Sequence, residues 1–194
     1  MMSQLDKNKK YTLEEFLDYV KEEERAELYE GTPVFMAPAS YEHEGVIINL
    51  GSEFNQVLKN SSCQVYGSNL QVIFPFKDEN KGKDDVTVMP DISIVCDKSK
   101  LRNKRCYGAP DLVVEVLSPS TARNDRLLKL NYYEKAGVRE YLIVDHQNRI
   151  IEKYVLKEGF YQSEDVYSIE NETFTSTIFP DATFAIDDIF GFLD

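Results

Sequence analysis

The sequence has few of the side chains that build zinc sites or disulfide frameworks. Among its 194 residues there are only two histidines and three cysteines, and Cys63, Cys96 and Cys106 form no closely spaced pair. A zinc site of cysteine and histidine ligands is therefore not expected. An odd number of cysteines also favours a reducing compartment over a disulfide framework. Any metal bound by this chain should have oxygen ligands.

Long apolar runs are absent too. No stretch approaches the about 18 uncharged apolar residues of a membrane-spanning helix, and residues 1–10 are polar and lysine-rich, without the apolar run of a signal peptide. We therefore expect a cytoplasmic protein with no membrane segment and a disordered N-terminus over residues 1–10. No Pro/Gly/Ser-rich linker divides the chain, so its length predicts one domain spanning residues 1–194.

Positive charge is scarce. The chain has 22 Lys and Arg against 34 Asp and Glu, a net charge of −12, which argues against broad, unselective attraction to nucleic acid. One basic stretch stands out and contains no acid after Asp97: Lys98, Lys100, Arg102, Lys104 and Arg105. We expect this stretch to contact a nucleic-acid backbone, since it joins two strands that each carry a candidate metal ligand. A plain exposed loop is the alternative.

The spacing of apolar and turn residues predicts an α/β chain. Thr12 and Glu15 form a capping box for a short amphipathic helix, and Ser40 is the predicted N-cap of a longer helix that ends near Asn60. A turn at Gly31 should separate two short extended pieces. Further strands are predicted at 65–76, 86–96, 111–117, 141–144, 150–156 and 160–169, with a polar loop at 77–85 and a helix over 122–136 that ends at Gly137.

Two predicted strands each contain one acid where an apolar residue is expected. Asp91 begins the run Asp-Ile-Ser-Ile-Val, and Glu115 interrupts Leu-Val-Val-Glu-Val-Leu. A buried carboxylate is costly unless it is paired or binds a metal. If the strands are neighbours, the two acids can hold Mg²⁺ with few protein oxygens and leave room for water and phosphate. Such an ion activates water and neutralises charge that develops on phosphorus.

At these residues the sequence resembles a known family. The Pro90-Asp91 step, Glu115 and the run from Ala109 to Ser120 look like the Uma-type restriction endonucleases of the PD-(D/E)XK nuclease superfamily. The likeness spans nearly the whole chain, and the stretch from Pro110 to Tyr141 is its most specific part. It also includes Glu27-Leu28, Gly31, the Ser40/His43 pair, Asp125, Lys129, Tyr133, Gly137-Val138 and Glu140-Tyr141.

The resemblance implies a restriction-endonuclease-like fold, with a central mixed β-sheet flanked by helices. It also implies an endonuclease that hydrolyses phosphodiester bonds, in DNA, with Mg²⁺ or Mn²⁺ held by Asp91 and Glu115. The superfamily motif Glu-x-Lys is incomplete here, because Leu117 stands at the lysine position. Lys129, on the helix that follows, resembles the migrated lysine of some branches and would orient or activate the attacking water. A homodimer follows by analogy, since cutting both strands of a duplex commonly uses two sites.

Each candidate also has a purely structural interpretation. Asp91 could cap a strand end, Glu115 could form a structural ion pair, and Lys129 could bond Asp125 four residues earlier on the helix. His43 could approach the metal or a phosphate, but no second histidine is near it in the sequence, so a surface or hydrogen-bonded role competes. Glu27 could face the metal, but it follows Glu22, Glu23 and Glu24, so a solvated acidic face competes.

Other functions fit the sequence less well. There is no Gly-rich phosphate loop and no Gly-x-Ser-x-Gly elbow. Two alternatives to an endonuclease stay open. One is a nuclease fold without turnover that serves binding or assembly, which Leu117 and the acidic charge motivate. The other is a metal-dependent hydrolase of a smaller phosphate ester.

Overall fold

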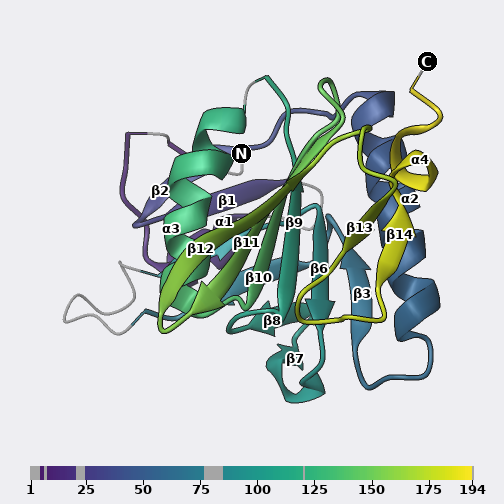
Figure 1. Ribbon diagram of the computed structural model, residues 1–194. Coiled ribbons are helices and arrows are strands. Elements are labelled where there is room, and N and C mark those ends of the chain that lie inside the picture. Colours follow the sequence, from purple (N-terminus) through teal and green to yellow (C-terminus); the bar gives the residue numbers. More distant parts are fainter. Residues whose placement is uncertain (1–4, 7, 21–24, 77–84, 120, 194) are drawn as a thin grey trace.

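The chain builds two six-stranded mixed sheets that are flanked by helices (Figure 1). The structure is a computed structural model that describes residues 5–6, 8–20, 25–76, 85–119 and 121–193. The strand order is β2-β1-β5-β4-β8-β7 in the first sheet and β12-β11-β10-β9-β6-β3 in the second. The predicted mixed sheet with flanking helices is therefore confirmed as the fold class, although the strands divide between two sheets.

The first sheet contains β1 (Ala26–Tyr29), β2 (Thr32–Phe35), β4 (Gln71–Phe74), β5 (Val86–Val88), β7 (Leu101–Arg102) and β8 (Arg105–Tyr107). The second contains β3 (Gln64–Gly67), β6 (Ile92–Val95), β9 (Leu112–Val116), β10 (Glu140–Asp145), β11 (Ile150–Lys157) and β12 (Phe160–Tyr167). A small pair is formed by β13 (Thr173–Thr175) and β14 (Thr183–Ala185). The helices are α1 (Leu13–Tyr19), α2 (Tyr41–Leu58), the 3-10 turn η1 (Lys98–Lys100), the π-helical η2 (Asn124–Lys129), α3 (Leu130–Ala136) and α4 (Ile186–Phe190).

One bent hairpin connects the two sheets. The segments predicted as single strands at 65–76 and 86–96 are each broken in two: β4 pairs with β5 in the first sheet, and β3 pairs with β6 in the second. The break in the second segment falls at Met89-Pro90-Asp91. Proline cannot donate a ladder hydrogen bond, so it suits this corner between sheets. Asp91 therefore lies where the chain leaves one sheet and enters the other.

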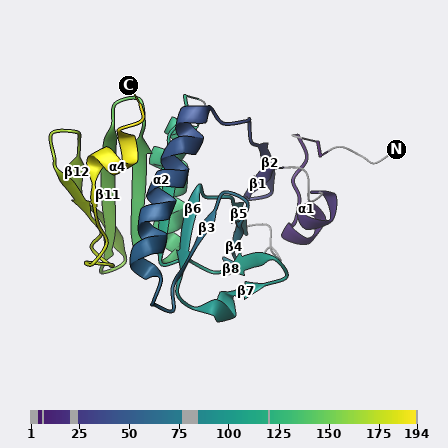
Figure 2. The same ribbon diagram turned by 90° about the vertical axis from the view of Figure 1, so that its right-hand side faces the viewer.

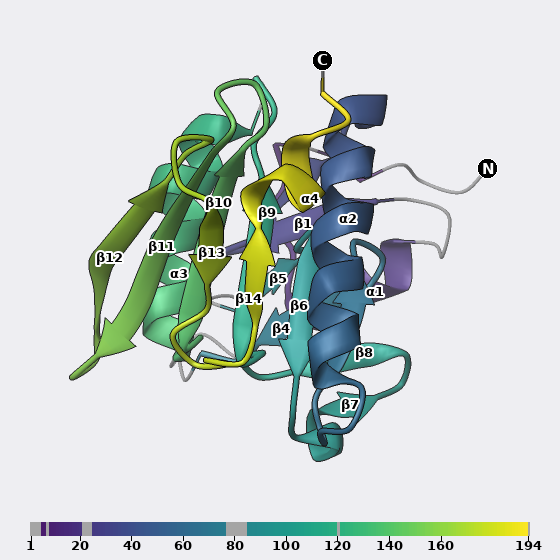
Figure 3. The same cartoon turned by 45° about the vertical axis from the view of Figure 1, so that its right-hand side comes forward.

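The second sheet is covered on both faces. Residues at even positions of β9, such as Val114 and Val116, pack with α2, α4 and the β13–β14 pair. Val113 and Leu117 point the other way and pack with Tyr133 of α3 and with strands of the first sheet. Figure 3 shows α2 lying along one side of this sheet and α3 on the other. The alternation predicted for β9 thus places Glu115 on the side of α3.

The predicted helix signals agree with the structure. Thr12 and Glu15 make the reciprocal hydrogen bonds of a capping box at α1, and the Ser40 hydroxyl accepts from the N–H of His43 at the start of α2. Gly137 ends α3 with φ of 88°. Helix α1 lies beside β1 and β2 at one end of the molecule, opposite β11 and β12 (Figure 2). Within the stretch 1–10, Leu5 is buried against Tyr11 and Phe16.

The basic stretch forms a defined hairpin. After η1, strands β7 and β8 pair through the two-residue turn Asn103-Lys104, whose φ angles of 50° and 60° are those of a type I′ turn. The predicted loop at 77–85 lies outside the described residues except for Asp85. None of the helices in the described part of the chain has the length and apolarity needed to span a membrane.

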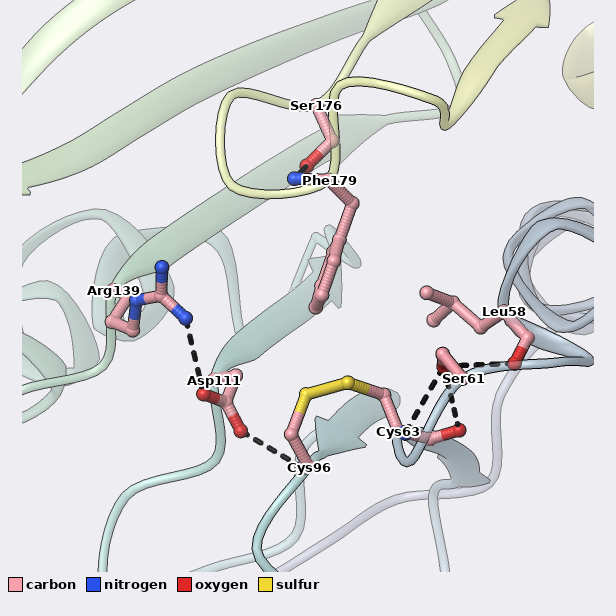
Figure 4. Close-up of a disulfide and its surroundings, with 8 residues drawn as sticks. All are labelled: Leu58, Ser61, Cys63, Cys96, Asp111, Arg139, Ser176 and Phe179. Carbon is pink, nitrogen blue, oxygen red and sulfur yellow. Dashed lines mark hydrogen bonds and ion pairs between the residues drawn. A yellow bond between two sulfur atoms is a disulfide. The ribbon is translucent and has the colours of Figure 1, made fainter.

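A disulfide joins Cys63 and Cys96 (Figure 4). Cys63 immediately precedes β3 and Cys96 immediately follows β6, and the register that pairs Gln64 with Val95 sets the two cysteines opposite each other. The expectation of a chain without disulfides is therefore wrong for this pair, because spacing along the sequence does not reveal which strands become neighbours. Cys106 is buried and free.

Candidate functional site

A cavity of about 790 Å³ lies where the corner at Asp91 meets the ends of β9 and β10. Five of the buried polar side chains that line it, here called the cavity base, are residues that the sequence singled out, and none of them is more than 7% exposed. They are Glu27 in β1, His43 in α2, Asp91 at the corner, Glu115 in β9 and Lys129 in η2. The fold thus brings these five candidate residues together at one cavity, and the burial of Glu27 excludes its interpretation as part of a solvated acidic face.

The ammonium of Lys129 lies at the centre of this group. Its Nζ is 2.9 Å from Glu115 Oε1, 3.2 Å from Glu27 Oε1 and 3.4 Å from Asp125 Oδ1. The hydroxyl of Tyr133 donates a short hydrogen bond to the same Glu115 oxygen. The i, i+4 bond to Asp125 that served as the structural alternative is therefore present, but it accompanies the contact with Glu115 rather than replacing it.

Helical spacing explains why these groups converge. Asp125, Lys129 and Tyr133 lie four residues apart, so successive turns of η2 and α3 direct all three toward Glu115 on the adjacent strand. The first of these turns is π-helical. Single π turns within helices occur frequently at functional sites.

Asp91 organises the other side of the cavity base. Its Oδ2 accepts a hydrogen bond of 2.8 Å from the N–H of Val116, which ties the corner to the end of β9. The Nε2 of His43 donates to the Val116 carbonyl at 2.8 Å and lies 3.4 Å from Asp91 Oδ2. Glu27 completes the corner, because its Oε1 accepts from the N–H of Met89 at 2.9 Å. His43 is thus buried and hydrogen-bonded rather than on the surface.

The pKa values of the groups at the cavity base depend on their burial and on the excess of carboxylates over ammonium groups. Burial raises the pKa of Glu115 well above its ordinary value, and the Lys129 ammonium opposes this rise. Burial also raises the pKa of Asp125. For Lys129, burial favours the neutral amine, but the carboxylates of Glu115 and Glu27 outweigh it and hold the pKa well above its usual value. Lys129 is therefore cationic and neutralises only part of the surrounding negative charge.

The donor set fits a hard divalent cation. Asp91 immediately precedes β6, and Glu115 lies in β9, the strand that pairs with β6. The buried Oδ1 of Asp125 lies 3.4 Å from the Lys129 ammonium but accepts no hydrogen bond from the described residues. No three His, Cys, Asp or Glu side chains in the described ranges form a complete metal cluster. Mg²⁺ needs no such cluster, because it is commonly held by one or two carboxylates and completes its shell with water and substrate phosphate. Oxygen ligands also suit Mn²⁺.

The basic hairpin lies at the other end of the second sheet. Strand β6 runs antiparallel to β9, with Ile92 opposite Val114 and Ile94 opposite Leu112, so the chain leaves β6 at the end remote from Glu115. At about 3.3 Å per residue, Cys96 lies about 16 Å from Asp91. Figure 3 shows β7 at the bottom and the first turn of α2, which lines the cavity, at the top. These basic residues therefore do not line the cavity, although their stretch joins β6 to β9.

Several cavity residues were not singled out from the sequence. His146 follows β10, and its ring lies 6.2 Å from that of His43, so the only two histidines of the chain meet here. The cations at the cavity wall are Arg25 and Arg149. Because β10 is parallel to β9, its carboxyl end reaches the same edge of the sheet. Had β10 been predicted as a parallel neighbour of β9, His146, which follows β10, would have been expected at the same edge of the sheet as Glu115.

Comparison with known proteins agrees with this architecture. Residues 13–187 match the Uma2 family, described as "Putative restriction endonuclease". An uncharacterised protein from Synechocystis is 29% identical over 147 residues, which cover 75% of this chain and 74% of that protein. A crystal structure described as "a putative nuclease" from Anabaena variabilis superposes with a TM-score of 0.74 over 95% of this chain and 99% of the other, at 21% identity, and this likeness shows the fold. The match over most of its length shows that the chain belongs to the Uma2 family of restriction-endonuclease-like proteins.

Proposed function

We propose that this protein is a divalent-metal-dependent endonuclease that hydrolyses phosphodiester bonds in DNA. One observation carries the proposal: Asp91 and Glu115, which are 24 positions apart in the sequence, line one cavity together with a lysine bonded to Glu115. A buried acidic group with a single embedded lysine is costly as a purely structural feature. Perturbed ionisable groups clustered in a cavity are typical of functional sites.

Asp91 and Glu115 would hold Mg²⁺ or Mn²⁺. The bound ion would supply Lewis-acid stabilisation of charge on the phosphate and a water of lowered pKa. The N–H of Val116, at the end of β9, donates to Asp91, and the N–H of Met89, at the corner between the sheets, donates to Glu27. Backbone groups therefore position both carboxylates. His43 is bonded to the Val116 carbonyl and lies near enough to Asp91 to hold that side of the cavity in place.

Lys129 would take the role of the lysine that is missing from the Glu-x-Lys motif, where Leu117 stands instead. Leu117 is 5% exposed and packs into the core beside α3, so it offers no polar group. The ammonium of Lys129 reaches Glu115 from η2 instead. Because it is cationic, it would donate a hydrogen bond to the attacking water and orient it, rather than remove its proton. Tyr133 holds the shared Glu115 oxygen from the next helical turn.

Phosphate binding and biological context complete the proposal. Arg25 and Arg149 would contact phosphates at the cavity, while Lys98, Lys100, Arg102, Lys104 and Arg105 would contact nucleic acid only at the distant end of the sheet. A homodimer and a cytoplasmic location remain part of the proposal. Disulfides are rare in the cytosol, so the oxidation state of Cys63 and Cys96 in freshly isolated protein tests the location. Sedimentation measures the oligomeric state.

The test is cleavage of plasmid and oligonucleotide DNA with Mg²⁺ or Mn²⁺. Wild type should cut, and Asp91→Asn and Glu115→Gln should lose cleavage, since each removes a charged metal ligand. Asp111→Asn is the matched control, because Asp111 immediately precedes β9 at the end opposite to Glu115 and bonds Cys96 and Arg139 instead. Cleavage that persists in both site variants, or that Asp111→Asn abolishes equally, would overturn the assignment.

A further inference from the structure

The residues that line the cavity are of two chemical kinds. Beside the carboxylates and Lys129 of the cavity base, many of the remaining lining residues are apolar, and these are here called the apolar wall. One part of that wall is the segment 34–39, Val-Phe-Met-Ala-Pro-Ala, which runs from the end of β2 toward α2. Another part is Phe192 with Leu193, near the end of the chain. Metal-dependent phosphodiester hydrolysis does not itself need an apolar wall, so this wall requires a separate explanation.

Two aromatic rings at the cavity are open to solvent. Tyr41, the first residue of α2, is 79% exposed, and Phe192 is 44% exposed. Phe192 is seated by a glycine: a Cβ on Gly45 would lie 2.4 Å from Cζ of Phe192. The ring of Phe192 can therefore pack against the first turns of α2 only because residue 45 has no side chain. Exposed aromatic rings bind nucleobases by stacking, whatever the base.

The cations at the wall complement this surface. Arg25 contributes one hydrogen bond, from its guanidinium to the carbonyl of Ser68 at 3.3 Å, while its Nε is buried without a partner among the described residues. Arg149 lies in the turn between β10 and β11, next to the ends of the parallel strands. A ligand with an anionic group near these arginines and a flat apolar group against the wall would satisfy both kinds of lining residue.

We propose that the cavity takes an unpaired nucleotide, with its phosphate at the carboxylate base and its nucleobase against the apolar wall formed by residues 34–39, Tyr41 and Phe192. This inference rests on the proposed nuclease function and names its substrate as single-stranded or locally opened DNA. A cavity of about 790 Å³ matches the size of sites that enclose one small organic ligand, roughly 300–1,000 Å³. In a duplex, each base is stacked and paired, so its face reaches such a wall only after unpairing.

The overall charge agrees with this substrate. Duplex binding that relies on backbone contacts needs many Lys and Arg side chains, whereas this chain has a net charge of −12 and presents two arginines at the cavity wall. Binding through base stacking needs fewer phosphate contacts. The affinity of the cavity for a single strand should therefore fall when an aromatic side chain is removed, and it should depend only weakly on salt concentration.

The test compares binding and cleavage of one sequence as a single strand and as a duplex. Binding is measured with Ca²⁺ in place of Mg²⁺ or Mn²⁺, so that a divalent cation offsets the charge of the carboxylates. The readouts are fluorescence anisotropy and quenching of a 2-aminopurine base in the oligonucleotide. We expect tighter binding of the single strand, quenching on binding, and about a ten-fold loss of single-strand affinity in Phe192→Ala, as for removal of one stacking partner. Gly45→Ala should weaken binding similarly by displacing that ring. Phe160→Ala is the matched control, since Phe160 is 69% exposed on β12 and does not line the cavity.

The outcomes separate the inference from the proposed function. Equal binding of the duplex, or Phe192→Ala and Gly45→Ala variants that bind like wild type, would overturn the inference even if wild type cuts DNA with Mn²⁺. Single-strand binding that depends on Phe192, without cleavage under any metal, would support the inference and count against the nuclease function. Faster cleavage of the single strand, lost in Asp91→Asn, supports both.

Discussion

Replacing Lys129 with methionine should destabilise the protein strongly at neutral pH. The substitution keeps most of the volume of the side chain but removes a cation that lies within 3.4 Å of Glu27, Glu115 and Asp125. All three carboxylates are at most 4% exposed, so water cannot replace the ammonium without rearrangement. Removing one partner of a buried ion pair typically costs about 3–5 kcal/mol. We expect a loss of this size in the free energy of unfolding, measured in urea with EDTA.

The loss should shrink as the pH falls. Burial already raises the pKa of Glu115 and Asp125, and the Lys129 charge is what opposes this rise. In Lys129→Met the pKa values of Glu115 and Asp125 rise further above their values in the unfolded chain. The folded state of the variant therefore binds protons more readily than its unfolded state. Groups shifted in this direction contribute stability at low pH and lose it as the pH rises through the folded-state pKa. The variant should therefore recover about 1.4 kcal/mol per pH unit for each proton taken up as the pH is lowered from neutral.

Lys153→Met provides the control. Lys153 is also buried, at 4% exposure, but its partners Glu164 and Asp165 are more open to solvent, so its removal leaves no enclosed negative cluster. Its destabilisation should be smaller and nearly independent of pH over the same range. A Lys129→Met loss below about 1 kcal/mol, or an equal loss at every pH, would refute the view that this ammonium neutralises a buried acidic group.

Two further predictions concern the metal and the cysteines. Mn²⁺ at about 100 times its dissociation constant should stabilise wild type by about 2.7 kcal/mol, which corresponds to a rise of roughly 5–10 °C in the melting temperature. Asp91→Asn should show no such rise. A rise of equal size in that variant would contradict the metal site. When the protein is unfolded without a reductant, a thiol assay should find one free thiol, that of Cys106. Reduction of the disulfide should lower the free energy of unfolding by about 3–4 kcal/mol, given the separation of 33 residues between its cysteines. Three free thiols before reduction would exclude the disulfide.

Local signals in the sequence were sufficient for most individual elements. The capping box at Thr12, the N-cap at Ser40 and the terminal Gly137 all correspond to helix boundaries, because capping depends on side chains within a few residues of each other. The buried strand around Glu115 was recognised by its β-branched run. The acids that stood out did so because an isolated carboxylate in an apolar run conflicts with burial.

Other features depended on contacts that sequence spacing does not encode. The break in residues 65–76 falls between Gly67 and Gln71, and the break in residues 86–96 falls at Met89-Pro90-Asp91, so each segment contributes one strand to each sheet. The basic stretch was predicted to contact a nucleic-acid backbone because it joins the two strands with the candidate metal ligands. The antiparallel register instead places it at the opposite end.

By itself, the sequence indicated which polar residues stand out from apolar surroundings: Asp91, Glu115 and Lys129 were singled out without coordinates. Glu115 lies in the predicted strand and Lys129 in the predicted helix, whereas Asp91 lies at the corner just before β6. The tertiary structure alone decided what surrounds them. It brought His146 next to His43, joined Cys63 to Cys96, and lined the cavity that holds the carboxylates with apolar residues as well. The reason is physical: local propensity acts over a few residues, whereas strand register and sheet order arise from packing of the whole core.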